Sequence, residues 1–173
     1  GYLNAVHYRL GERPFFIEKW PENILYLGFI AKAYPRARLL HLRRHPMDAC
    51  FAMYKQSFFR YAYTLENVGR YYVAYDRLAR HWRALLGERF FEVEYEALVR
   101  DPEGQTRRLL QQLQLDFEPA CLEFDRNEAA SATASSVQVR EKIHTRSVQR
   151  WKQFQRHLEP LRRILEGAGI AVD

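Results

Sequence analysis

Short apolar runs alternate along this chain with longer segments in which apolar residues recur every three or four positions. Three of the runs are short enough to form buried strands, over residues 15–17, 38–42 and 89–94. Helical spacing and helix-start signals predict helices over residues 21–34, 46–60, 64–86, 96–99, 102–112 and 118–124, and a last helical region capped by Ser147. Strands that alternate with helices indicate an α/β fold, in which a parallel sheet carries helices on both faces.

The longest predicted helix has signals at both ends. Thr64 is suited to its N-cap, and Gly87 ends it. Its apolar residues form one stripe at intervals of three and four, made of Leu65, Val68, Tyr72, Tyr75, Ala79, Trp82 and Leu86. We interpret this stripe as core rather than as a ligand site. Residues 127–138 are poor in large apolar groups and are predicted to form a loop.

Three side chains each follow one of the predicted strands. Lys19, Arg44 and Tyr95 stand at these strand ends, and ligands of parallel sheets bind beyond the carboxyl ends of the strands. Arg44 also precedes Pro46, which suits the first position of a helix, and a helix N-terminus beside an arginine is a ready anion site. Taken alone, Arg44 is explained equally well as a solvated loop residue. The coincidence of the three positions at one sheet edge favours a ligand site.

The composition sets the class of protein. The chain has 173 residues, of which 47% are apolar and 28% charged, and this suits one globular domain over residues 1–173. Its net charge of +6 fits a protein that handles nucleic acid, an acidic surface or a phosphorylated cofactor. The sequence shows no membrane-spanning run, signal peptide or metal-ligand spacing. Cys50 and Cys121 lie among apolar residues and are predicted to be buried thiols of a reducing, cytoplasmic compartment.

Four sequence elements resemble those of sulfotransferases that use 3'-phosphoadenosine-5'-phosphosulfate. Arg44-x-Pro-x-Asp before a helix resembles the 3'-phosphate-binding element of that family, and Lys19-Trp-Pro-x-Asn resembles its upstream Lys-x-Pro-x-Asn. Val-Glu-Tyr95-Glu-Ala-Leu and the Ser-Ser-Val-Gln-Val-Arg segment at 135–140 are similar to two further family elements. The likeness is greatest to bacterial sulfotransferases found behind tetratricopeptide repeats and to tyrosylprotein sulfotransferases, and it extends from Lys19 to about Leu161.

The resemblance implies a role for each of these residues. Lys19 would be catalytic, because in the family this lysine stabilises charge on the bridging oxygen as the sulfonate leaves. Arg44 would hold the 3'-phosphate, and Tyr95 would pack on or near the adenine. A loop that folds over the cofactor would supply the other cofactor-binding residues, Ser135, Ser136 and Arg140. Ala52 stands where the family has a phosphate-binding serine.

The same resemblance implies a fold and an activity. The expected fold is a P-loop-NTPase-like sulfotransferase sheet, incomplete at the N-terminus because the family's phosphosulfate loop and general base have no counterpart in this sequence. The chain is therefore expected to be the C-terminal part of a catalytic domain and to be inactive alone. The whole protein would transfer a sulfonate, without a metal, to a hydroxyl or amine of a small-molecule, sugar, lipid or peptide acceptor. Upstream tetratricopeptide repeats are a further partner that the resemblance suggests.

Two other functions stay open at this point. A nucleotide-binding regulatory module that has lost catalysis is favoured by Ala52 and by the missing loop. A nucleic-acid binder would use the basic residues of 140–163 for the backbone, with Trp151 and Phe154 as stacking groups. The second alternative leaves the strand-end positions unexplained and ranks last, so neither nucleic acid nor a membrane is an expected partner.

Overall fold

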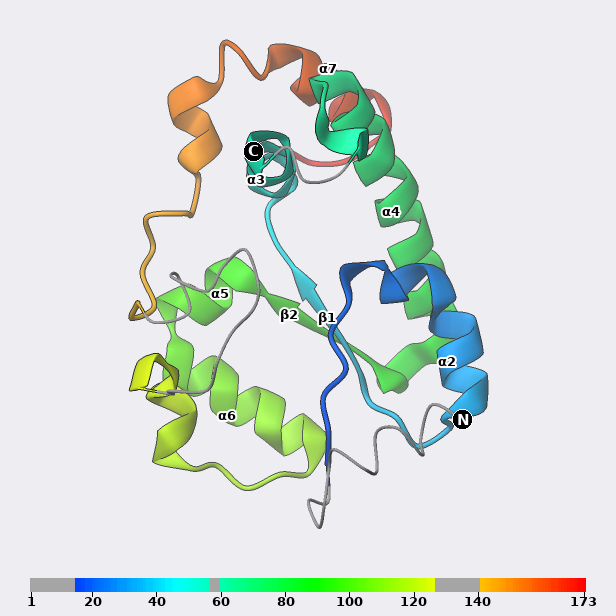
Figure 1. Cartoon of the computed structure of the whole chain (residues 1–173), viewed down its shortest axis with the longest axis vertical. Coiled ribbons are helices and arrows are strands. Elements are labelled where there is room, and N and C mark those ends of the chain that lie inside the picture. The colour runs from blue at the N-terminus through cyan, green and yellow to red at the C-terminus, as the bar shows by residue number, and fades with distance from the viewer. Residues whose placement is uncertain (1–14, 57–59, 127–140) are drawn as a thin grey trace. The chain divides into compact units, whose positions relative to one another are not determined.

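The computed structural model describes residues 15–56, 60–126 and 141–173. The chain forms two compact units, Gly1–Pro35 and Arg36–Asp173 (Figure 1). The first unit holds a 3₁₀ helix, η1 (Pro21–Tyr26), followed by helix α2 (Leu27–Ala33). In the described ranges, no helix is both long and apolar enough to cross a lipid bilayer.

The prediction of a strand over residues 15–17 is wrong. The structure has no strand there, and Phe15 and Ile17 are 68% and 89% exposed. A strand needs a ladder of backbone hydrogen bonds to a neighbour, and three residues offer few such bonds. Apolar content over so short a run therefore does not distinguish a strand from an exposed segment.

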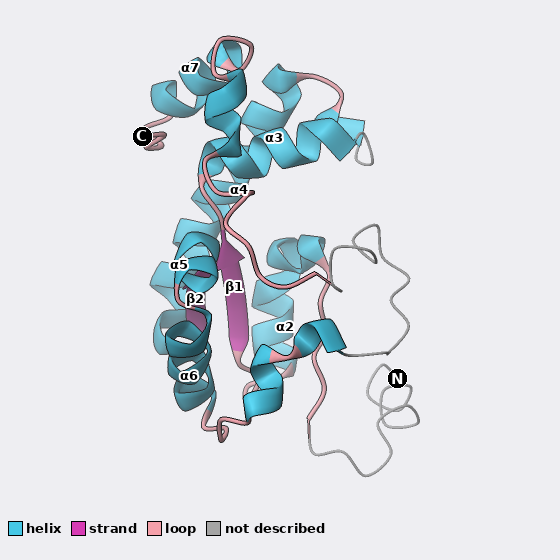
Figure 2. Cartoon of the chain, turned by 90° about the vertical axis from the view of Figure 1, so that its left-hand side faces the viewer, coloured by secondary structure: helices cyan, strands magenta, loops and turns pink. Residues whose placement is uncertain are grey.

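The second unit contains a sheet of two parallel strands (Figure 2). Strand β1 (Leu39–Arg43) pairs with β2 (Phe90–Glu94), in a register that aligns Leu39 with Phe90 and Arg43 with Glu94. The α/β class and these two strands are confirmed, whereas the described residues form no third strand. In Figure 1 the strands run between helix α4 (Leu65–Leu86) on one side and helices α5 (Tyr95–Arg100) and α6 (Pro102–Leu113) on the other.

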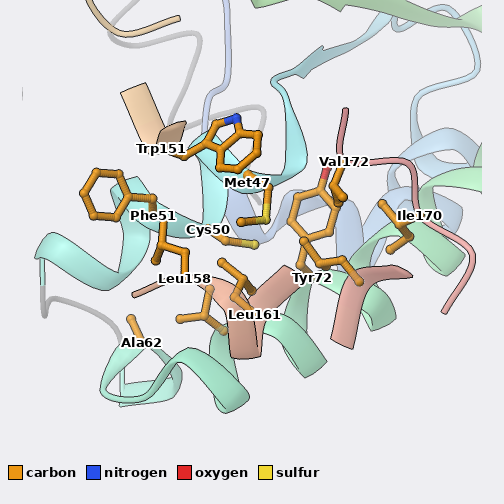
Figure 3. Packing of buried hydrophobic residues seen from close by; sticks show 12 residues of the cluster. Met47, Cys50, Phe51, Ala62, Tyr72, Trp151, Leu158, Leu161, Ile170 and Val172 are labelled. Atoms are coloured by element: carbon orange, nitrogen blue, oxygen red, sulfur yellow. The ribbon is translucent and has the colours of Figure 1, made fainter. Parts of the chain in front are cut away.

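The main apolar core lies among helices α3 (Pro46–Gln56), α4 and α7 (Glu159–Gly167), as Figure 3 shows. The buried cluster consists of Met47, Cys50, Phe51, Ala62, Val68, Tyr72, Trp151, Leu158, Leu161, Leu165, Ile170 and Val172. Val68, Tyr72 and Ala79 of the predicted stripe are all buried. The part of the stripe from Leu65 to Tyr75 therefore belongs to this core, as its spacing predicts, whereas Trp82 and Leu86 are half-buried.

Local capping signals set the bounds of several helices. The Thr64 hydroxyl accepts a hydrogen bond from the Asn67 amide at 3.1 Å, which confirms the predicted N-cap of α4. Gly87 ends α4 with a φ of 52°, a conformation that glycine adopts without steric cost. The Asp101 carboxylate caps α6 in the same way, through the Gly104 amide at 3.0 Å.

Two predictions on the C-terminal half are wrong. Ser147 does not cap a helix, because residues 146–149 form a turn before the 3₁₀ helix η7 (Arg150–Phe154), and α7 starts only at Glu159. Cys121 is exposed rather than buried, because it lies in the short 3₁₀ helix η4 (Pro119–Leu122), none of whose residues is buried. Short 3₁₀ helices η2 (Arg60–Ala62), η3 (Gly87–Arg89) and η5 (Phe124–Arg126) complete the described elements.

Candidate functional site

The carboxyl ends of β1 and β2 lie side by side because the strands are parallel neighbours. Arg44 follows β1, and Tyr95 begins the helix that follows β2. The guanidinium carbon of Arg44 lies 5.1 Å from the centre of the Tyr95 ring, within the range of a cation–π contact. The structure thus brings together two of the three residues that the sequence places at strand ends.

The Arg44 guanidinium is only partly satisfied by the protein. Its Nη2 donates a hydrogen bond to the Ser147 carbonyl oxygen at 2.6 Å. Its Nε is buried and has no hydrogen-bond partner in the part of the chain that the structure describes. A buried donor without a partner is costly.

Side-chain contacts tie the two strand-to-helix junctions to each other. The Glu96 carboxylate accepts a hydrogen bond from the His45 amide at 2.9 Å. Glu96 lies in the first turn of α5, but Glu94 is the N-cap residue and makes no side-chain cap bond there. The Glu96 side chain thus bonds the amide of His45 rather than capping its own helix, and this bond joins α5 to the start of α3.

Trp151 supports the same junction from the core side. Its ring stacks on the His45 imidazole, with centroids 5.7 Å apart and an interplanar angle of 8°. Trp151 is 6% exposed, and its indole nitrogen has no hydrogen-bond partner among the described residues. Figure 3 shows this nitrogen on the side of the ring that faces away from Met47 and Cys50.

A cavity of about 750 Å³ opens beside Tyr95. It is lined by Tyr95, Val99, Phe124, Glu141, Lys142, Ile143, His144, Arg146, Ser147, Arg150 and Gln153. Three of these side chains are cationic and one is acidic, and the Arg146 guanidinium binds the Glu141 carboxylate at 2.7 Å. A concave surface with this charge balance, next to a flat aromatic ring, suits a ligand that carries both phosphate and an aromatic base.

A partly buried hydrogen-bonded network joins the sheet to α4. His41 Nδ1 is 3.1 Å from a Glu92 oxygen, and its Nε2 is 2.6 Å from the Tyr75 hydroxyl. Arg83 donates two hydrogen bonds of 2.6 Å to the Glu92 carboxylate. This network therefore links α4 to both strands.

Burial and charge set the protonation states in this network. Burial lowers the pKa of His41 below its ordinary value of 6.5, against the opposing effect of Glu92. Burial also acts to raise the pKa of Glu92, but hydrogen bonds from Arg83 and His41 prevail and lower it below 4.5. Burial raises the pKa of Tyr75 to about 12. His41 is therefore neutral at pH 7, with Nδ1–H donating to Glu92 and Nε2 accepting from Tyr75.

The structure does not test the positions of the other predicted site residues relative to Arg44. Lys19 is exposed and belongs to the first unit, so its place beside Arg44 stays a prediction. Ser135, Ser136 and Arg140 lie outside the described residues. Ala52 lies on α3 one turn after Asp48, so both project from the same face of that helix.

Sequence reasoning missed the turn at residues 146–149 as a partner of Arg44. Besides the Arg44 bond to Ser147, the Asp48 carboxylate accepts hydrogen bonds from the amides of Gln149 and Trp151. The bonding residues are 101 to 103 positions apart in the chain. No local pattern in the sequence indicates such a pairing. The only sequence signal was an acidic residue in the first turn of a helix, which the helix dipole explains by itself.

Within the described ranges, no three histidine, cysteine or acidic residues lie close enough together to hold a metal ion.

Comparison with known proteins matches the chain to a family model described as the sulfotransferase family, over residues 2–119. A protein of Aquifex aeolicus strain VF5, described as uncharacterized, is 30% identical over 95% of this chain and 22% of its own length. The omega-hydroxy-beta-dihydromenaquinone-9 sulfotransferase Stf3 of Mycobacterium bovis, and its namesake in Mycobacterium tuberculosis, are each 28% identical over 68% of this chain and 33% of their own length. The chain thus spans a third or less of these relatives. The family model covers more than half of the chain, so the chain belongs to the sulfotransferase family.

Proposed function

We propose that the whole protein transfers a sulfonate group from 3'-phosphoadenosine-5'-phosphosulfate to a hydroxyl acceptor. The observation that carries this proposal is the Arg44 guanidinium, which lies over the ring of Tyr95, a residue that lines a cavity with three cationic side chains. Membership of the sulfotransferase family supports the reaction class. A hydroxyl is preferred to an amine because the names of the mycobacterial relatives specify an omega-hydroxy compound.

The proposed reaction is an in-line displacement at sulfur. A bond forms between the acceptor oxygen and sulfur, and the bond between sulfur and the bridging oxygen of the donor breaks. The acceptor proton passes to a general base, which is proposed to come from another part of the whole protein. Lys19 is proposed to stabilise the negative charge on the bridging oxygen, as an ammonium at a developing charge lowers a barrier. The products are the sulfated acceptor and adenosine 3',5'-bisphosphate.

The residues at the strand ends fit the nucleotide half of this donor. Arg44 carries further N–H donors besides the Nη2 that binds the Ser147 carbonyl, and guanidinium–phosphate bonds can form in pairs. Tyr95 is half-buried at the cavity, where an adenine could pack against it. Ser135, Ser136 and Arg140 are proposed to complete the phosphate contacts. The P-loop-like sheet and the phosphosulfate loop of the family are proposed for the whole protein rather than for this chain, which we expect to be inactive alone.

Calorimetry with adenosine 3',5'-bisphosphate tests the role of Arg44. We expect Arg44→Ala to weaken binding about a hundredfold, because two charge-assisted hydrogen bonds contribute roughly 3 kcal/mol. Arg108, which is exposed on α6 away from the cavity lining, supplies the matched control. Arg108→Ala removes the same charge and should leave the Kd within about twofold. Equal Kd values for Arg44→Ala and Arg108→Ala would refute the assignment of Arg44 to the phosphate.

A nucleotide-binding module without catalysis is the second candidate, and Ala52 favours it. Ala52 stands on α3 where the family has a phosphate-binding serine, so one hydroxyl ligand is absent. Both candidates predict binding of the bisphosphate. Turnover of a labelled sulfonate donor by the whole protein separates them, because only the enzyme would release the bisphosphate at a rate that depends on the acceptor.

A further inference from the structure

Arg44 and Asp48 lie four residues apart, on either side of Pro46, and both bind the same distant segment. Arg44 Nη2 donates to the Ser147 carbonyl oxygen at 2.6 Å. One oxygen of Asp48 accepts from the Gln149 amide at 2.6 Å, and the other accepts from the Trp151 amide at 2.9 Å. The three bonds fix residues 147–151, which we call the basic turn because Arg150 lies within it and Arg146 directly precedes it.

Asp48 has no role that would leave it open to a ligand. It is 1% exposed, and each of its oxygens already accepts a backbone amide. No ion pair to Asp48 occurs in the part of the chain that the structure describes, so these amides and the N-terminal turn of α3 stabilise its buried charge. A general base needs access to the acceptor proton, and Asp48 lacks that access.

The backbone of the basic turn is shaped to receive a carboxylate. Gln149 has a φ of 56°, in the left-handed region that non-glycine residues occupy at a cost. This conformation lets the amides of Gln149 and Trp151 point to one acceptor, as in the concave backbone nests that bind anions. The two hydrogen bonds to the buried Asp48 carboxylate, which occupies that concavity, offset the conformational free energy of the left-handed Gln149.

The basic turn in turn forms part of the cavity wall. Arg146, Ser147 and Arg150 line the cavity beside Tyr95. Any movement of the turn away from α3 would carry the cationic side chains of Arg146 and Arg150 away from the ring and from Arg44. Positioning errors of this kind weaken binding because the charged groups no longer converge on one ligand.

We infer that Arg44 and Asp48 form a two-point clamp on the basic turn, and that Asp48 is a positioning residue which places Arg146 and Arg150 along the nucleotide cavity. The part of this inference that concerns the nucleotide rests on the proposed function. The clamp itself rests only on the geometry of residues 44–48 and 147–151.

Amide hydrogen exchange of Asp48→Asn tests the clamp directly. Asparagine has the same shape but can accept at one position only, and its amide group meets a backbone donor at the other. We expect the Gln149 and Trp151 amides to exchange about tenfold faster or more, after correction for any change in global stability measured on the α4 amides. Arg44→Ala is the second variant, and it should also speed exchange at these two amides because Ser147 loses its tether.

Binding of adenosine 3',5'-bisphosphate supplies the second readout. We expect the Kd of Asp48→Asn to rise about tenfold, as the loss of one charge-assisted bond at the turn is transmitted to the cavity. The matched control is Asp101→Asn, which removes a carboxylate–amide cap of 3.0 Å on α6 and touches neither the turn nor the cavity lining. This control should change neither the Kd nor the exchange of Gln149 and Trp151.

The two readouts separate failure of the clamp from failure of the proposed function. Unchanged exchange at Gln149 and Trp151 in both Asp48→Asn and Arg44→Ala would overturn the clamp. Faster exchange with an unchanged Kd would overturn the positioning role. If wild-type protein does not bind the bisphosphate, the proposed function and the positioning role are both refuted, while the exchange data still decide whether the clamp exists.

Discussion

His41 shows how one residue couples the sheet to the helix beneath it. It is 9% exposed and bonds through both ring nitrogens, to Glu92 on the neighbouring strand and to Tyr75 on α4. Arg43 and Arg83 also face the Glu92 carboxylate. Protonation of His41 would remove the acceptor that Tyr75 requires and would place a further cation beside two arginines. The neutral form is therefore the one that fits the fold.

Stability should consequently fall on acidification in two stages. The folded-state pKa of His41 is lowered, so unfolding takes up a proton below pH 6.5, and the stability contributed by the neutral ring is present above that pH and lost below it. The lowered pKa of Glu92 adds a second loss below pH 4.5. In urea unfolding between pH 6.5 and 4.5, we expect His41→Gln to reduce the slope of unfolding free energy against pH, by up to about 1.4 kcal/mol per pH unit. A slope in His41→Gln equal to that of the wild type would contradict a neutral, buried His41.

At the scale of elements, sequence signals predict secondary structure correctly where it depends on local backbone preferences. They fail where the structure depends on a partner far away in the chain. Thr64 and Gly87 mark the ends of α4 through their own backbone preferences, and both are readable in the sequence. Residues 15–17 are apolar like a strand, but only pairing decides whether a strand forms. Ser147 has the side chain of an N-cap, yet its carbonyl is bound by an arginine far away in the chain, and the segment becomes a turn.

The contact between α4 and α7 depends on the absence of a side chain at Gly69. A Cβ there would lie 3.0 Å from Ile164 Cγ2 and 3.2 Å from Leu161 Cδ1, and Leu161 is fully buried. Gly69→Ala should therefore reduce the free energy of unfolding by about 1 kcal/mol in urea titrations, because overpacking outweighs the gain in helix propensity. Gly167→Ala is the matched control, since a Cβ at that end of α7 meets no atom within 4 Å and should leave stability unchanged or slightly higher. Stabilisation by Gly69→Ala would show that α7 shifts without cost.

For the molecule as a whole, the sequence predicts the pairing of Arg44 with Tyr95 better than it predicts the residues that line the neighbouring cavity. The meeting of Arg44 and Tyr95 follows from two parallel strands and needs no further information. The basic turn that completes the cavity could not be predicted, because its bonds to Arg44 and Asp48 span more than a hundred residues and involve backbone atoms. A side-chain motif in a sequence does not indicate which distant backbone groups its side chains will hydrogen-bond.

Lys19 provides the test of whether the two units of the chain serve one reaction. It is proposed to act on the bridging oxygen of the donor, which is present in 3'-phosphoadenosine-5'-phosphosulfate and becomes a terminal phosphate oxygen in the bisphosphate product. Lys19→Ala should therefore lower turnover of the whole protein by about a hundredfold or more. The bisphosphate should still bind this variant, and at a hundredfold excess over its Kd it should stabilise the fold by about 2.7 kcal/mol. Arg44→Ala should lose that stabilisation as well as turnover. Wild-type turnover in Lys19→Ala would show that another residue is the catalytic cation. If Lys19→Ala and Arg44→Ala both lose the stabilisation of the fold by the bisphosphate to the same extent, Lys19 would be assigned to nucleotide binding instead.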